Sequence, residues 1–177
     1  RLMRLFAAHD MPLTIFGCAL ALERNPEAAA ATNLAYLLYG FEFTEFALIS
    51  SKMHEVWVRA VSGRLGSGVR YTPTISYHTF PVPKLTAKSK VDLTRCAEDI
   101  LLAREANFPA TIADLYDPEK MPADLRRAHD RNDEVLERSL IGRRFRNDTE
   151  RLEKLFELYT KMTLGDVSAK QTNMKSP

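Results

Sequence analysis

The segment Phe80-Pro81-Val82-Pro83-Lys84 divides the sequence into two parts of different character. Each proline fixes its own φ angle and disfavours the helical region for the residue before it, so an extended connection is predicted here. Aromatic and apolar runs are mixed before this segment, whereas the pattern after it is charged and helical. We therefore predict domains at residues 1–84 and 85–165, followed by a flexible tail at residues 166–177.

The first part is predicted to combine one helix with short strands. Leu34–Tyr39 (LAYLLY) is an apolar and aromatic run of strand length. Apolar residues recur at steps of three and four over residues 45–61, which predicts an amphipathic helix that Gly63 ends. Strand-forming residue types dominate residues 69–80, and Pro73 among them indicates a bulge, a turn or an edge position.

The second part is predicted to contain three helices, at residues 89–106, from Pro122 and from Asn147. A Ser-x-x-Asp pattern at residue 89 and an Asn-x-x-Glu pattern at residue 147 are typical of helix starts. The expected inward residues are Leu93, Ala97, Ile100, Leu101, Leu125, Ala128, Val135, Leu136, Leu152, Leu155, Phe156, Tyr159 and Met162. The predicted fold class is therefore α+β, a small mixed α/β portion followed by a mainly helical C-terminal domain.

Composition and motifs exclude several function classes. A chain of 177 residues with 45% hydrophobic and 27% charged residues fits a soluble globular protein, and it contains no apolar run long enough for a membrane span. The two cysteines, Cys18 and Cys96, lack disulfide-framework or metal-ligand spacing, which favours reduced thiols in the cytoplasm. Since the chain opens on Arg1 rather than methionine, we expect a fragment of a longer protein.

Motifs for independent catalysis are also absent. No two of the four histidines have zinc-ligand spacing, and no P-loop, GxGxxG or nucleophile-elbow motif occurs. We predict no catalytic residue, no metal and no cofactor in this chain. His54 and Tyr116 are predicted to be packing residues rather than catalytic ones.

Two stretches resemble a known family. The series SSKMHEVWVRAVSGRLGSGVRYTPTISYHTFPVP, at Ser50–Pro83, resembles the end of the target-recognition domain of MmeI-like type II restriction-modification enzymes and related adenine-specific DNA methyltransferases. The segment Phe108–Met162 is similar to their helical C-terminal domain. The specific parts are the SxxMHxxWxRAVxGRL pattern, the FPxP ending and the LYDPxxMPxxLxxAHxxxD string, within a likeness covering roughly residues 33–163.

This resemblance implies a division of labour with domains outside the chain. The family places S-adenosylmethionine-binding and NPPY catalytic motifs in an upstream methyltransferase domain, commonly with a nuclease domain before it. Neither motif occurs here. The resemblance therefore implies a bacterial-type cytoplasmic, DNA-associated fragment that recognises double-stranded DNA and contacts the methyltransferase domain. The parent would methylate adenine N6 after flipping the base out of the duplex.

The resemblance also implies which residues contact bases. In the family, alternate positions just after the GRL turn read base pairs, which here are Gly66, Gly68 and Arg70. If residues 65–71 are extended, these three face one side of a strand. The Arg70 guanidinium can bond the O6 and N7 atoms of a guanine in the major groove. The two glycines either let the backbone approach DNA closely or leave a base pair unread.

Three further cations, Arg64, Arg59 and Lys52, are candidates for phosphate contacts. For Arg64, a bond inside the domain is an equal alternative. A different function class also stays open, a structural or protein-interaction helical domain without DNA contact. The 17 basic and 17 acidic residues at positions 85–177 favour that alternative for the helices.

Overall fold

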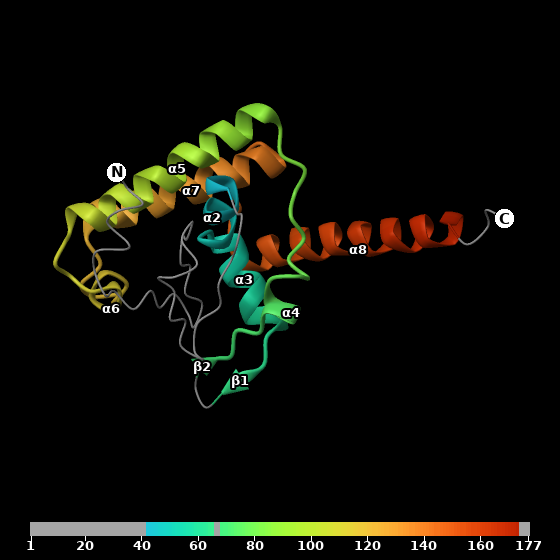
Figure 1. Cartoon of the computed structure of the whole chain (residues 1–177), viewed down its shortest axis with the longest axis horizontal. Coiled ribbons are helices and arrows are strands. Elements are labelled where there is room, and N and C mark those ends of the chain that lie inside the picture. The colour runs from blue at the N-terminus through green and yellow to red at the C-terminus, as the bar shows by residue number, and fades with distance from the viewer. Residues whose placement is uncertain (1–41, 66–67, 174–177) are drawn as a thin grey trace, which may run out of the picture.

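The computed structural model describes residues 42–65 and 68–173, and most of these residues are helical. The elements are α2 (Phe43–Ile49), α3 (Lys52–Val61), β1 (Arg64–Leu65), β2 (Gly68–Val69), α4 (Pro73–Ser76), α5 (Ala87–Ala106), α6 (Ile112–Leu115), α7 (Ala123–Ile141) and α8 (Asp148–Asn173). α5 and α7 lie side by side, α2 packs against α5, and α3 connects this layer to α8, which extends away from it (Figure 1).

The predicted α+β class is wrong, because the described residues form an all-α fold. Their strands are two pairs of residues in one antiparallel hairpin, with Arg64 opposite Val69 and Leu65 opposite Gly68. The strand expected around Pro73 is the short helix α4 instead. A proline at the start of a helix loses no hydrogen bond, and the Thr72 amide N–H donates to Ser76 Oγ at 3.1 Å. The predicted strand at residues 34–39 lies outside the described residues.

The helix expected over residues 45–61 is two helices, α2 and α3. Ser50 ends α2, and Ser51 begins α3 because its hydroxyl accepts the His54 amide N–H at 3.2 Å. A serine that bonds the free amides of a first turn stabilises a new helix start at that point. The break turns α3 relative to α2, and α3 then ends at Val61 with Ser62 and Gly63 following.

The three helices expected after residue 84 are present as α5, α7 and α8. Asn147 caps α8 as predicted, accepting the Glu150 amide N–H on its Oδ1 at 2.9 Å. α5 starts slightly earlier than expected, because Thr86 rather than Ser89 is its cap. α7 ends at Gly142, whose φ of 78° lies in the left-handed region that favours glycine.

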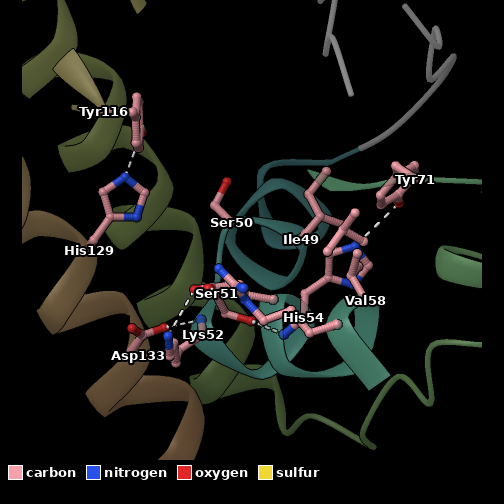
Figure 2. A pocket seen from close by; sticks show the side chains of 13 residues that line it. Ile49, Ser50, Ser51, Lys52, His54, Val58, Tyr71, Tyr116, His129 and Asp133 are labelled. Atoms are coloured by element: carbon pink, nitrogen blue, oxygen red, sulfur yellow. Dashed lines mark hydrogen bonds and ion pairs between the residues drawn. The ribbon is translucent and has the colours of Figure 1, made fainter. Parts of the chain in front are cut away.

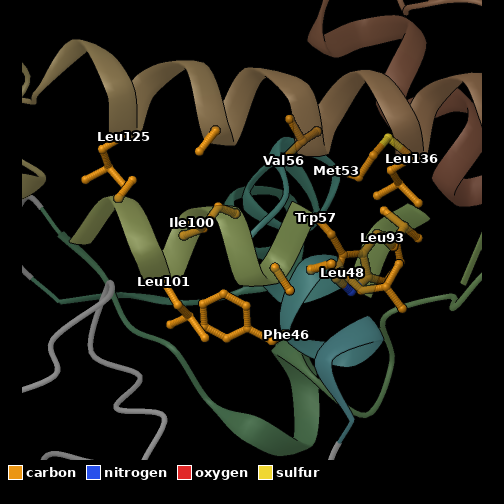
Figure 3. Packing of buried hydrophobic residues seen from close by; sticks show 14 of the residues in the cluster. Phe46, Leu48, Met53, Val56, Trp57, Leu93, Ile100, Leu101, Leu125 and Leu136 are labelled. Atoms are coloured by element: carbon orange, nitrogen blue, oxygen red, sulfur yellow. The ribbon is translucent and has the colours of Figure 1, made fainter. Parts of the chain in front are cut away.

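One hydrophobic core joins residues from both sides of the Phe80–Lys84 segment. α3 supplies its largest member, Trp57, and the α5 residues expected to point inward are buried as predicted (Figure 3). Phe156 of α8 was also expected to point inward, but it is 46% exposed, and its ring forms a T-shaped contact with Trp57. The labelled core residues are Phe46, Leu48, Met53, Val56, Trp57, Leu93, Ile100, Leu101, Leu125 and Leu136.

Candidate DNA-recognition surface

The β1–β2 hairpin places Arg64 and Arg70 close together at its base. Arg64 pairs with Val69 across the hairpin, and Arg70 follows Val69 directly. The Arg70 amide N–H donates to the Gly63 carbonyl oxygen at 2.9 Å, which closes the base of the hairpin. Both arginine side chains are exposed, and within the described residues neither guanidinium is bound by a carboxylate. Two exposed cations therefore lie at the same end of the hairpin.

The expected extended segment over residues 65–71 is wrong, because the chain reverses direction between Leu65 and Gly68. Gly68 belongs to β2, whereas Gly66 falls in the connection, outside the described residues. Arg70 is nonetheless exposed while the next residue, Tyr71, is half-buried. The two neighbours thus face opposite sides of the chain, one toward solvent and one toward α3.

The two other phosphate candidates already have partners within the chain. Arg59 donates its Nε–H to Glu55 Oε1 at 2.8 Å. Lys52 Nζ lies 3.0 Å from Glu55 Oε2 and 3.9 Å from Asp148 Oδ2. Lys52 begins α3 whereas the hairpin follows its end, so Lys52 is separated from Arg70 by the length of that helix. The structure groups Arg64 with Arg70 and leaves Lys52 apart.

A pocket of about 230 Å³ lies between α3, the end of β2 and α7 (Figure 2). Its polar lining includes His54, Tyr71, Tyr116, His129 and Asp133. Burial lowers the pKa of His54 to about 4, and burial with the nearby Arg104 lowers that of His129 to about 4. Both rings are neutral near pH 7, so they act as hydrogen-bonding groups and are poorly matched to accept protons at that pH.

One end of this pocket contains a buried polar cluster. Arg104 is only 5% exposed, and its Nε–H donates to Tyr116 Oη at 2.9 Å. Tyr116 Oη lies 2.6 Å from His129 Nε2. Because an arginine can only donate, the tyrosine hydroxyl donates in turn to the histidine. The Arg104 guanidinium also stacks on the Phe46 ring, so the cluster joins α2, α5 and α7.

Asp133 of α7 has the opposite pKa shift to the two histidines. Burial raises its pKa to about 6, although its Oδ1 accepts the Lys52 amide N–H at 2.7 Å, which favours the ionised form. Glu137, one turn later on α7, adds a repulsive negative charge. The carboxyl group thus anchors the first turn of α3 to α7 and is partly ionised in mildly acidic solution.

These shifts predict how stability depends on pH. Between about pH 4 and 6.5 the unfolded chain binds more protons at the two histidines, whereas the folded chain binds more at Asp133. A net uptake of about one proton on unfolding near pH 5 should lower the free energy of unfolding by about 1.4 kcal/mol per pH unit of acidification. Asp133→Asn removes the carboxyl group whose proton binding opposes that of the histidines. The free energy of unfolding should then fall about twice as steeply with acidification, as measured by urea unfolding at several pH values. Parallel curves for the two proteins would contradict this expectation.

Sequence reasoning missed the contacts that organise this region. His54 and Tyr116 were expected to be packing residues, and His54 is buried while Tyr116 is partly buried against the core, but their partners lie 17 and 12 to 13 residues away in the sequence. No local pattern indicates such pairs. Within residues 42–65 and 68–173, no group of three or more His, Cys, Asp or Glu side chains could bind a metal ion. None of the helices described is long and apolar enough to cross a membrane.

Comparison with known proteins identifies relatives of this chain. Residues 20–84 match the family model of the MmeI target recognition domain, and residues 85–165 match that of the MmeI C-terminal domain. DNA methyltransferase A of Bacillus subtilis (strain 168) is 39% identical over 132 residues, which cover 75% of this chain and 15% of that protein.

A solved structure is also similar. It is that of the type IIL restriction-modification enzyme MmeI in complex with DNA, with a TM-score of 0.68 and 32% sequence identity. The match covers 75% of this chain and 19% of the MmeI chain, so this chain spans less than a fifth of either relative. On its sequence and its fold, the chain belongs to the MmeI family and comprises the target recognition and C-terminal domains of that family.

Proposed function

We propose that this chain is the DNA-recognition and scaffolding portion of a site-specific adenine-N6 DNA methyltransferase. The observation that supports it most directly is the hairpin base, where two exposed arginines, without carboxylate partners among the described residues, lie close together in a chain of the MmeI family. MmeI itself has been solved in complex with DNA. Double-stranded DNA is accordingly the proposed partner.

Arg70 is the proposed base-reading residue. Its backbone is fixed by the bond to Gly63 while its side chain is exposed, which suits a residue that must present a guanidinium in a defined direction. Two parallel bonds to guanine O6 and N7 would discriminate against other bases by about 1–3 kcal/mol. Gly66 and Gly68 have no side chain to contribute, so any role they have in recognition is through the backbone.

The remaining cations differ in how available they are for phosphate. Arg64 is the first candidate because it is exposed beside Arg70. Arg59 and Lys52 would have to exchange existing carboxylate partners for phosphate oxygens, which reduces the net gain. We therefore rank Arg64 above Arg59 and Lys52.

Catalysis in this proposal belongs to a methyltransferase domain upstream of the chain. That domain would bind S-adenosylmethionine and transfer its methyl group to a flipped adenine, while this chain contributes sequence selection. The two pocket histidines, whose pKa values are lowered to about 4, serve in this proposal as hydrogen-bonding groups.

The test compares the methylated motif of the complete methyltransferase containing this chain with that of its Arg70→Ala variant. We expect methylation to persist while one base pair of the motif becomes relaxed, because a base contact is lost and the catalytic domain is untouched. Arg95→Ala is the matched control and should leave the motif unchanged, since Arg95 is an exposed arginine on α5, a helix that Figure 1 shows apart from β1 and β2. An unchanged motif and rate for Arg70→Ala would contradict base reading by Arg70 and favour a scaffold without direct readout.

A further inference from the structure

The chain that leaves the hairpin is attached to α3 by three side-chain hydrogen bonds. Each joins one residue of α3 or its C-terminal cap to one residue of the segment 71–79. The pairs are His54 Nε2 with Tyr71 Oη at 3.3 Å, Trp57 Nε1 with Thr79 Oγ1 at 3.2 Å, and Ser62 Oγ with Ser76 Oγ at 2.7 Å. The first of these pairs lies next to the proposed base-reading residue.

His54 is well suited to serve as a fixed anchor. It is 5% exposed, its backbone is fixed by the Ser51 cap, and its ring packs edge-on against Phe80 with centroids 4.7 Å apart. These contacts come from the core and from α3, so the ring has little freedom to move. A tyrosine hydroxyl both donates and accepts, so the bond to Tyr71 can form with either neutral tautomer of the histidine.

Tyr71 follows Arg70 directly in the chain, so the hydrogen bond between Tyr71 and His54 also restrains the Arg70 backbone. The Arg70 backbone is then constrained on both sides. Its own N–H donates a hydrogen bond to the Gly63 carbonyl oxygen at 2.9 Å, and the side chain of the next residue, Tyr71, is hydrogen-bonded to His54 of α3 (Figure 2). Its guanidinium stays exposed. A bidentate contact to a base tolerates only small displacements, so the constraint matters more for discrimination than for contact itself.

We propose that His54 and Tyr71 are positioning residues that determine how selectively Arg70 recognises its base pair. The inference rests on the proposed function, since it requires that Arg70 contact a base. It concerns selectivity rather than the transfer reaction, because neither side chain needs to touch DNA.

The test is Tyr71→Phe in the complete methyltransferase, which removes one hydroxyl and keeps the ring. The readout is the ratio of kcat/KM for cognate DNA to that for DNA altered at the base pair that Arg70→Ala relaxes. We expect this ratio to fall about fivefold. Loss of folded protein would lower both rates equally and leave the ratio unchanged, so a merely structural role does not produce this result. Tyr159→Phe, a hydroxyl deletion on α8, is the matched control and should not change the ratio.

A double variant separates this inference from the function on which it depends. In an Arg70→Ala background, Tyr71→Phe should change the ratio by less than about 1.5-fold, because the residue that it positions is absent. An unchanged ratio for Tyr71→Phe alone, with Arg70→Ala still relaxing the motif, would overturn the positioning role and leave the proposed function standing. An unchanged motif for Arg70→Ala would overturn both.

Discussion

Replacing Trp57 with alanine is expected to lower the free energy of unfolding by about 3–5 kcal/mol. The Trp57 side chain is 1% exposed and joins three parts of the molecule. Its ring lies against Phe156 and Tyr159 of α8, with centroids 5.5 and 5.4 Å away, and its Nε1–H donates to Thr79 Oγ1. Alanine would leave a cavity between α3 and α8 and would remove the hydrogen bond that Thr79 Oγ1 accepts, although the Thr79 hydroxyl still donates to the Ile75 carbonyl oxygen. Since domains have only about 5–15 kcal/mol of stability in total, this loss is a large fraction of the free energy of unfolding.

The measurement is urea unfolding followed by far-UV circular dichroism, because Trp57 is the only tryptophan and fluorescence would disappear with it. Two controls separate its contributions. Trp57→Phe keeps an aromatic ring and loses the bond to Thr79, so a smaller loss is expected. Phe156→Ala removes a ring that is 46% exposed and should cost about 1 kcal/mol. A Trp57→Ala protein within about 1 kcal/mol of the original would show that this ring does not join α8 to the core.

The parts of the fold that sequence predicted are those that depend on neighbours a few residues apart. The inward face of α5 follows from the helical period alone, and Leu93, Ala97, Ile100 and Leu101 are all buried. The cap at Asn147 is likewise local, since its side chain bonds an amide three residues on. A helix's face and start are encoded within one or two turns, so periodicity and capping patterns were sufficient there.

The predicted fold class was wrong where the local sequence is compatible with two different secondary structures. Pro73 among strand-forming residues suits an edge strand, but it equally suits the first turn of a helix, and Ser76 supplies the cap-like bond that favours the helix. The break between α2 and α3 depends on a similar choice at Ser50–Ser51. Packing against the rest of the core determines which solution is adopted, and a single sequence contains no direct record of that packing.

In the candidate site, too, local sequence predicted some features but not the contacts between residues far apart in the chain. Exposure of Arg70 beside a half-buried Tyr71 agrees with simple alternation along the chain. The hydrogen bond that fixes Tyr71 comes from His54, 17 residues earlier, and was not predictable from spacing. Glu137 is a stronger case, because α7 has the charge pattern of a solvated helix and yet this carboxylate is fully buried.

Replacing Glu137 with glutamine is expected to lower the free energy of unfolding by about 3–5 kcal/mol. Its Oε1 accepts Arg151 Nε–H at 2.8 Å, and its Oε2 accepts the Phe145 amide N–H at 2.9 Å. These bonds join α7 to the connection that follows it and to the first turn of α8. Glutamine has only one oxygen, so its NH₂ group would face a donor, and Arg151, which is 12% exposed, would lose its buried counter-charge.

Urea unfolding of single and double variants distinguishes this buried network from an ordinary ion pair. Glu134→Gln is the matched control, since Glu134 pairs with Arg138 at the surface with side chains 38% and 64% exposed, and a change within about 0.5 kcal/mol is expected. Combining Glu137→Gln with Arg151→Gln should cost less than the sum of the two single losses, by about 1–3 kcal/mol, because each single variant removes the opposite charge from the group that stays. Strict additivity would contradict the energetic coupling between Glu137 and Arg151.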